Sequence, residues 1–112
     1  MPPKDRSLGH ILFWLIAGSR GGVNRGKIIS LLRGTPMNAN QLASALDVDY
    51  RTIRHHLDIL EKNEVVTPTG DRYGLVYFLS QNMEKNYAVF ESIWNRIGKS
   101  EKSNARDETT DG

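Results

Sequence analysis

Cysteine is absent from the 112-residue sequence, which has only three histidines. Without cysteine, the chain has no disulfide bond, no thiolate metal site and no cysteine nucleophile. Long apolar runs are missing too, since the longest nearly unbroken run covers residues 11–17, whereas a membrane-spanning helix needs about 20 residues. The first residues are not followed by the apolar run and small-residue cleavage site of a secretory signal peptide. We therefore expect a cytoplasmic protein without a membrane helix.

Catalytic and nucleotide-binding patterns are also missing. The glycines within residues 18–26 lack the preceding strand and the following Lys-Ser or Lys-Thr pair of a phosphate-binding loop. His55 and His56 are adjacent, so on a helix they point about 100° apart and do not form a metal site by themselves. A chain of this length can bury the core of one domain and hardly of two. We expect no enzyme, no metal site and no cofactor.

Positive charge is concentrated in the first half of the chain. Residues 1–62 contain nine basic and five acidic side chains, whereas residues 63–112 contain six and eight, so that the net charge is +2. This asymmetry suits a basic face for a polyanion together with an acidic tail.

The apolar residues predict one folded domain over residues 7–97, between a flexible N-terminus (1–6) and a disordered C-terminal tail (98–112). The first predicted helix, over 7–20, is apolar nearly all round and therefore needs two surfaces to cover it. In a chain this short one surface is the core of the domain, and the other is most simply a second copy of the chain. We therefore expect a homodimer.

Three further helices are predicted in the first two thirds of the chain. The first covers 23–32 and is stopped by Gly34 and Pro36. Asn38, three residues before Gln41, has the spacing of a capping box and predicts the start of a short helix. After the connection Asp47–Asp49, whose last residue can serve as a helix cap, another helix is predicted over about 50–62.

A β-hairpin and a last helix complete the pattern. Branched and aromatic residues over about 65–79 predict two strands, with a turn at Gly70 and Asp71. The last helix is predicted over 82–97, where Gly98 would be its C-terminal cap. Two short helices joined by a tight turn and followed by a hairpin form the plan of a winged helix-turn-helix. The predicted fold class is mainly α with a β-hairpin wing, and with additional N- and C-terminal dimerisation helices over 7–20 and 82–97.

The helix over 50–62 has a face suited to the major groove of DNA. If Ile53, Leu57 and Leu60 point inward, the basic and hydrogen-bonding side chains of its first turns point outward or to the flanks. Arginine can bind guanine with two parallel donors, so Arg51 and Arg54 are the best candidates for base reading or close phosphate contact. The other candidates are Tyr50, Thr52 and His55 on this helix, Asn40 and Gln41 at the start of the preceding helix, and Arg72 at the hairpin tip. Arg25 and Lys27 are expected to extend the positive surface.

The run NANQLASALDVDYRTIRHHLDILEKNEVV (38–66), followed by GDRYGLVYFL (70–79), resembles the archaeal branch of the ArsR-like winged-helix transcription regulators. The resemblance covers roughly residues 21–97. It implies a homodimer that pairs through its first and last helices and binds operator DNA, with Arg72 in the wing. The resulting candidates for the dimer interface are Leu12, Phe13, Trp14, Ile16, Phe90 and Trp94. Metal-sensing members of the family have cysteines in or before the recognition helix, which this chain lacks, so we expect no metal-sensing role.

Two other classes of function remain open at this point. The winged-helix architecture is also used in protein–protein interaction modules that bind no DNA, although the basic turn at residues 50–55 argues against this reading. The apolar N-terminal helix could lie on a membrane surface, but it lacks the lysine-rich polar face of such helices. The alternative without a DNA-binding role is that Arg51 and Arg54 lie on a solvated helix face and form local ion pairs.

Overall fold

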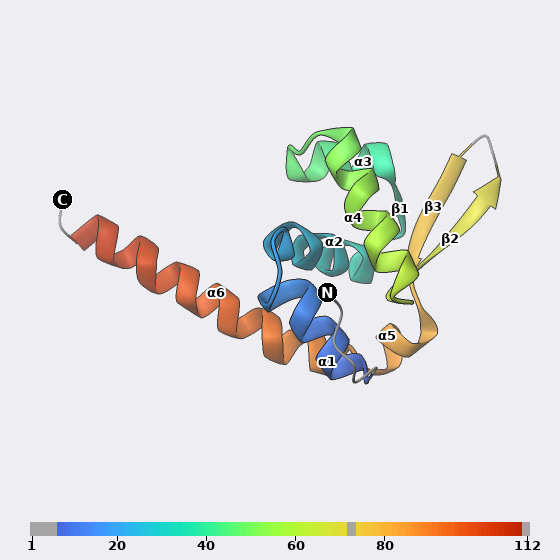
Figure 1. The fold of residues 1–112 in the computed structure, drawn as a ribbon. Coiled ribbons are helices and arrows are strands. Elements are labelled where there is room, and N and C mark those ends of the chain that lie inside the picture. Colours follow the sequence, from blue (N-terminus) through green and yellow to red (C-terminus); the bar gives the residue numbers. More distant parts are fainter. Residues whose placement is uncertain (1–6, 72–73, 111–112) are drawn as a thin grey trace.

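The computed structural model describes residues 7–71 and 74–110, with side chains as far as Gly98 (Figure 1). Its elements are α1 (Leu8–Leu12), η1 (Phe13–Ala17), α2 (Gly22–Gly34), β1 (Met37–Asn38), α3 (Ala39–Leu46), α4 (Tyr50–Lys62), β2 (Val66–Asp71), β3 (Gly74–Leu79), α5 (Gln81–Lys85) and α6 (Tyr87–Thr110). A mainly helical fold with a small antiparallel sheet is therefore confirmed. The predicted flexible segment 1–6 lies outside the described residues.

The N-terminal helix differs in form from the single helix predicted over 7–20. Ser7 caps α1 by accepting a hydrogen bond from the backbone N–H of His10, and the chain then widens into the π-helical turn η1, which ends at Ala17. Ile11, Leu12, Leu15 and Ile16 are all buried, whereas Phe13 is 54% exposed. The apolar segment thus supplies one side of the core and leaves one aromatic ring uncovered.

Local capping sets the helix-turn-helix as predicted. The Asn38 side chain accepts from the backbone N–H of Gln41 at 2.7 Å, and the Gln41 side chain accepts from the backbone N–H of Asn38 at 2.8 Å. This reciprocal capping box begins α3, which ends at Asp47 in a left-handed conformation (φ 54°). Asp49 caps α4 by accepting from the backbone N–H of Arg51 at 2.9 Å. The boundaries predicted from these capping residues are confirmed.

The sheet has the order β1-β3-β2, and both pairs are antiparallel. Gly70 and Asp71 are the last residues of β2, where they pair with Leu75 and Gly74 of β3, so the turn predicted at Gly70 and Asp71 is wrong. The strand β1 was not predicted, because two residues are too few to show a period of two. It joins the start of α3 to the wing through the pair Met37 and Tyr77.

The C-terminal helical region is divided in two, where the sequence predicted one helix. Ser80 caps α5 by accepting from the backbone N–H of Met83, and the chain breaks at Asn86 before α6 begins. α6 continues to Thr110, so the structure does not show the helix end predicted at Gly98 or, over 98–110, the predicted disordered tail. A glycine inside an exposed helix costs only about 1 kcal/mol relative to alanine. No proline follows Gly98 to stop the helix.

α6 packs against α1 and η1, and its C-terminal half extends beyond the rest of the domain (Figure 1). Trp94 of α6 also lies against Gly26 of α2, where a Cβ atom would be 2.3 Å from the indole ring. The side chains of α1, η1, α2, α3, α4, the sheet, α5 and α6 share a single core. None of the helices in the described part of the chain combines the length and the apolar character that are needed to span a bilayer.

Candidate nucleic-acid interface

The helix α4 has one face in the core and one in solvent. Ile53, Leu57 and Leu60 are completely buried, as their spacing predicts. The opposite side is exposed over the first two turns, where it carries Tyr50, Arg51, Thr52 and His55. The predicted orientation of the helix is therefore confirmed, and its exposed side chains are those able to donate hydrogen bonds to bases and phosphates.

Arg51 is the most available cation of this surface. Its side chain is exposed on the first turn of α4, and among the residues that the structure describes no side-chain hydrogen bond or ion pair engages its guanidinium. Its backbone N–H is bound by Asp49, which fixes the start of the helix but leaves the side chain free. A guanidinium in this state can form two parallel hydrogen bonds without first breaking an internal one.

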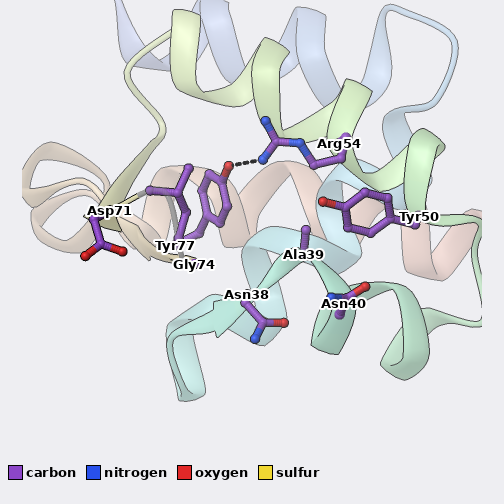
Figure 2. Close-up of a pocket in the computed structure, with 9 residues that line it drawn as sticks. Asn38, Ala39, Asn40, Tyr50, Arg54, Asp71, Gly74 and Tyr77 are labelled. Carbon is purple, nitrogen blue, oxygen red and sulfur yellow. Dashed lines mark hydrogen bonds between the residues drawn. The ribbon is translucent and has the colours of Figure 1, made fainter.

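Arg54 is placed differently. It is half-buried, donates a hydrogen bond to the Tyr77 hydroxyl on β3, and lies 3.5 Å from the Asp58 carboxylate one turn along α4 (Figure 2). Burial acts to lower the pKa of Arg54, but Tyr77 and Asp58 raise it on balance, so the guanidinium stays charged. Arg54 thus points towards the wing, whereas Arg51 is free on the outer side.

An open groove of about 460 Å³ separates α4 from β3 and the start of α3. It is lined by Asn38, Ala39, Asn40, Tyr50, Arg54, Asp71, Gly74, Leu75 and Tyr77 (Figure 2). Of the predicted contacts, the structure brings Asn40, Tyr50 and Arg54 together here. Gln41 does not line the groove, since its side chain is used in the capping box. Arg72 lies outside the described residues.

Tyr77 is the residue of this groove that the sequence analysis missed. Its ring is buried, with 1% of the residue exposed, and its position in an alternating strand is typical of a core residue. Only the register of β3 against β1 and the approach of α4 bring its hydroxyl to Arg54. The sole signal in the sequence was a polar tip on a core aromatic residue, since a buried tyrosine usually finds a partner for its hydroxyl.

Arg25 does not extend the positive surface, which corrects the prediction. It is buried, and its Nε donates to the Leu15 carbonyl at 2.9 Å. Its Nη2 donates to the Ser19 hydroxyl at 2.6 Å and to the Arg20 carbonyl at 2.8 Å. These bonds hold the end of η1 and the following loop onto α2. Lys27 remains exposed, as predicted.

The predicted dimer residues fall into two groups. Leu12, Ile16 and Phe90 are buried in the core of this chain, so the structure corrects their predicted place at a dimer interface. Phe13 is exposed, and Trp14 and Trp94 are half-buried. The Trp94 ring stacks on Phe90 with 5.8 Å between ring centroids, which places most of it inside the domain. An all-round apolar helix in this fold is covered mainly by the chain itself.

No three His, Asp or Glu side chains in the described part of the chain come close enough together to hold a metal ion. His55 and His56 diverge as neighbours on a helix do, with 5.9 Å between ring centroids and 52° between ring planes. His55 faces solvent, whereas His56 faces the core.

Residues 23–67 match a known protein family, described as the bacterial regulatory protein, arsR family. The matched segment contains nearly all of α2, the whole of α3 and α4, and the start of β2, and therefore the complete helix-turn-helix. No curated protein matches the sequence.

Solved structures of transcription regulators share the fold. A MarR transcriptional regulator from Methanosarcina mazei Go1 is 20% identical, with a TM-score of 0.63 over 80% of this chain and 65% of that one. A probable transcriptional regulator from Pseudomonas aeruginosa is 20% identical, with a TM-score of 0.60 over 88% and 83%. MepR of S. aureus, in a complex with DNA, is 19% identical, with a TM-score of 0.56 over 78% and 75%. This chain thus spans just under two thirds of the Methanosarcina protein.

The fold and these similarities define the class: the chain is a winged helix-turn-helix protein, as the sequence predicted. Within that class, its helix-turn-helix segment is similar to that of the arsR family over residues 23–67.

Proposed function

We propose that this chain is a DNA-binding transcription regulator that acts as a homodimer. The observation that carries the proposal is the exposed side of α4, where Arg51, Thr52 and His55 lie opposite the buried apolar residues. In this proposal α4 enters the major groove and the β2–β3 wing contacts the neighbouring minor groove or backbone. The match of residues 23–67 with the arsR family and the DNA complex of MepR support it. The archaeal branch of the family remains a prediction.

The proposed contacts follow from side-chain chemistry. Arg51 reads a base, because its free guanidinium matches the O6 and N7 acceptors of guanine. Thr52 and His55, exposed on the same turns, contact a base or a phosphate. Arg72, in the wing, contacts the minor groove or the backbone, and Gln41 contacts a phosphate beside the start of α3. In this proposal the protein binds nucleic acid and catalyses no reaction. As a transcription regulator it acts in the cytoplasm.

The proposed dimer uses the apolar surface that the fold leaves uncovered beside η1. Phe13 is 54% exposed and Val23 is 37% exposed. An open groove of about 600 Å³ borders this surface and is lined by Ile16, Ala17, Ser19, Gly21, Gly22, Val23, Asn24 and Ile97. Pairing of two copies through this region would cover the surface, and a two-fold dimer would present two recognition helices about 34 Å apart to successive major grooves.

The test is selection of bound duplexes from a random pool, followed by titration of the selected duplex. If each protomer neutralises three or four phosphates, the log-log salt slope for the dimer should be about −5 to −7. Arg51→Ala should weaken binding more than tenfold and relax the selected sequence. Lys62→Ala, at the exposed far end of α4, is the matched control and should change binding little. A folded protein that retains no duplex at low salt would contradict the proposal.

A protein–protein interaction module is the second candidate. The outer face of β3 exposes Val76 (37%) and Phe78 (40%), which are apolar and lie away from the face packed on α4. Phe78→Ser separates the two functions, because it should leave DNA binding unchanged in a regulator of the proposed kind. The interaction module is favoured if the wild-type chain retains no duplex and captures a protein partner that the Phe78→Ser variant does not capture.

A further inference from the structure

The Tyr77 hydroxyl links the wing to the recognition helix. The Tyr77 ring is fixed in the core of the domain, and its hydroxyl reaches the groove between α4 and β3. There it accepts the hydrogen bond from Arg54 (Figure 2). A long arginine side chain loses much rotational freedom when it is held at one point. Because Tyr77 itself cannot move without disturbing the core, the Arg54 guanidinium is held in place before any ligand arrives.

Other donors lie around the same space. Tyr50 begins α4 and is 47% exposed, and Asn40, on the first turn of α3, is exposed on the opposite wall. The hydroxyl of Tyr50 and the amide of Asn40 add neutral donors to the charged guanidinium. Asp71 lines the end of the groove that belongs to the wing, and the three donors lie at the other end. The favourable place for an anion is therefore the end formed by Tyr50, Asn40 and Arg54.

We propose that Tyr77 is a positioning residue that directs Arg54 onto a phosphate of the DNA backbone, in the groove that Tyr50 and Asn40 also line. Base reading then falls to Arg51 and its exposed neighbours on α4, and Arg54 fixes the register of the helix on the duplex. This inference rests on the proposed DNA-binding function and deepens it, since it separates two arginines that the sequence presents as equivalent.

The charge of Asp58 fits this division. Its carboxylate lies 3.5 Å from Nη2 of Arg54, whereas Tyr77 accepts from Nη1, and 55% of the Asp58 side chain is exposed. The exposed ion pair is weak in water, so it holds the guanidinium loosely and does not compete strongly with a phosphate. Tyr77, by contrast, is buried and neutral and provides the fixed point.

The test is Tyr77→Phe, which removes the hydroxyl and leaves the ring in the core. We expect affinity for the selected duplex to fall about threefold to tenfold, because the charged guanidinium loses a hydrogen bond that orients it. The salt slope should become less steep by about one per protomer, as expected when one phosphate contact is lost. The preference between duplex sequences should stay unchanged. Tyr87→Phe on α6, the same deletion far from the groove, is the control and should leave binding as it was.

A double-mutant cycle with Arg54→Gln separates positioning from a general effect on folding. Arg54→Gln should weaken binding to all duplexes alike, and Tyr77→Phe should then have no further effect, since its target side chain is gone. Arg54 is half-exposed, so this variant reports on the groove even if Tyr77→Phe proves unstable. Arg51→Gln should instead reduce the discrimination between duplexes.

Three results would overturn the inference while leaving the proposed function intact: unchanged binding by Tyr77→Phe, fully additive effects in the double variant, or a change of sequence preference in Arg54→Gln. A wild-type protein that binds no duplex would overturn the proposed function itself, and the inference with it.

Discussion

Arg25 Nη1 lies 3.3 Å from His56 Nδ1, and this contact joins α2 to α4 inside the domain. Arginine carries only donors, so the His56 Nδ1 atom must accept and the ring is neutral at that nitrogen. Within the described residues no carboxylate pairs with Arg25, whose other donors bind two carbonyls and a hydroxyl. The position of α4 therefore depends on a buried cation that is satisfied by neutral acceptors.

Stability should decrease in mild acid because of this contact. Burial, the charge of Arg25 and His55 together hold the pKa of His56 below its ordinary value of 6.5. The unfolded chain therefore binds a proton at His56 before the folded chain does, so the free energy of unfolding should be constant above about pH 7 and fall as the pH drops through 6.5 towards the lowered pKa. Thermal unfolding between about pH 8 and about pH 5 measures this change. His56→Gln, which keeps a neutral acceptor for Arg25, should flatten the profile, and an equally steep one would contradict the assignment.

The buried Arg25 network should be important for stability. Arg25→Met keeps most of the volume but removes the donors that bind the Leu15 and Arg20 carbonyls and the Ser19 hydroxyl. We expect the free energy of unfolding to fall by about 2–4 kcal/mol, as is typical when a buried hydrogen-bonded network is broken. Lys27→Met, an exposed cation on the same helix, is the matched control and should change stability by less than about 0.5 kcal/mol. Urea unfolding compares the two, and equal values would show that Arg25 is not a structural residue.

Gly26 is required by the indole of Trp94. A Cβ atom at Gly26 would lie 2.3 Å from the ring, whereas a Cβ atom at Gly34, at the end of the same helix, would meet nothing within 4 Å. Gly26→Ala should therefore destabilise the fold by about 1–3 kcal/mol through overpacking, although alanine favours a helix. Gly34→Ala should be neutral or slightly stabilising. Adding Trp94→Leu to Gly26→Ala should recover part of the loss, and failure to do so would place the strain elsewhere.

How much of this structure the sequence predicts depends on how far apart in the chain the interacting residues are. Asn38 with Gln41, and Asp49 with Arg51, cap helices through neighbours in the chain, so residue types and spacing are sufficient. The buried face of α4 follows from the helical period in the same way. Tyr77 and Arg54 are 23 residues apart, and their hydrogen bond depends on strand register and on how α4 meets the sheet, which no local pattern contains.

The errors have the same physical origin. Arg25 was predicted on the surface because arginine is seldom buried, yet carbonyls of η1 and of the following loop compensate for its burial. Leu12 and Ile16 were placed at a dimer interface because an all-round apolar helix needs two surfaces to cover it, and Phe90 was placed there by the resemblance to the ArsR-like regulators. All three side chains are buried in one chain, where α1 and η1 pack against α6 and η1 packs against α2.

Phe13 is the residue on which dimerisation should depend most. It is the most exposed large apolar side chain in the described part of the chain, at 54%, and lies on η1, whose neighbours Leu12 and Leu15 are buried. Phe13→Glu should therefore leave the fold intact and place a charge in the proposed interface, so that sedimentation at micromolar concentration shows a monomer where the wild type shows a dimer. Phe78→Ser, at a similarly exposed ring on the wing, is the matched control and should stay dimeric. If both variants keep the dimer mass, the copies pair through another surface. If the wild type is itself a monomer, the two recognition helices cannot bind as one unit, and each α4 must recognise its site alone.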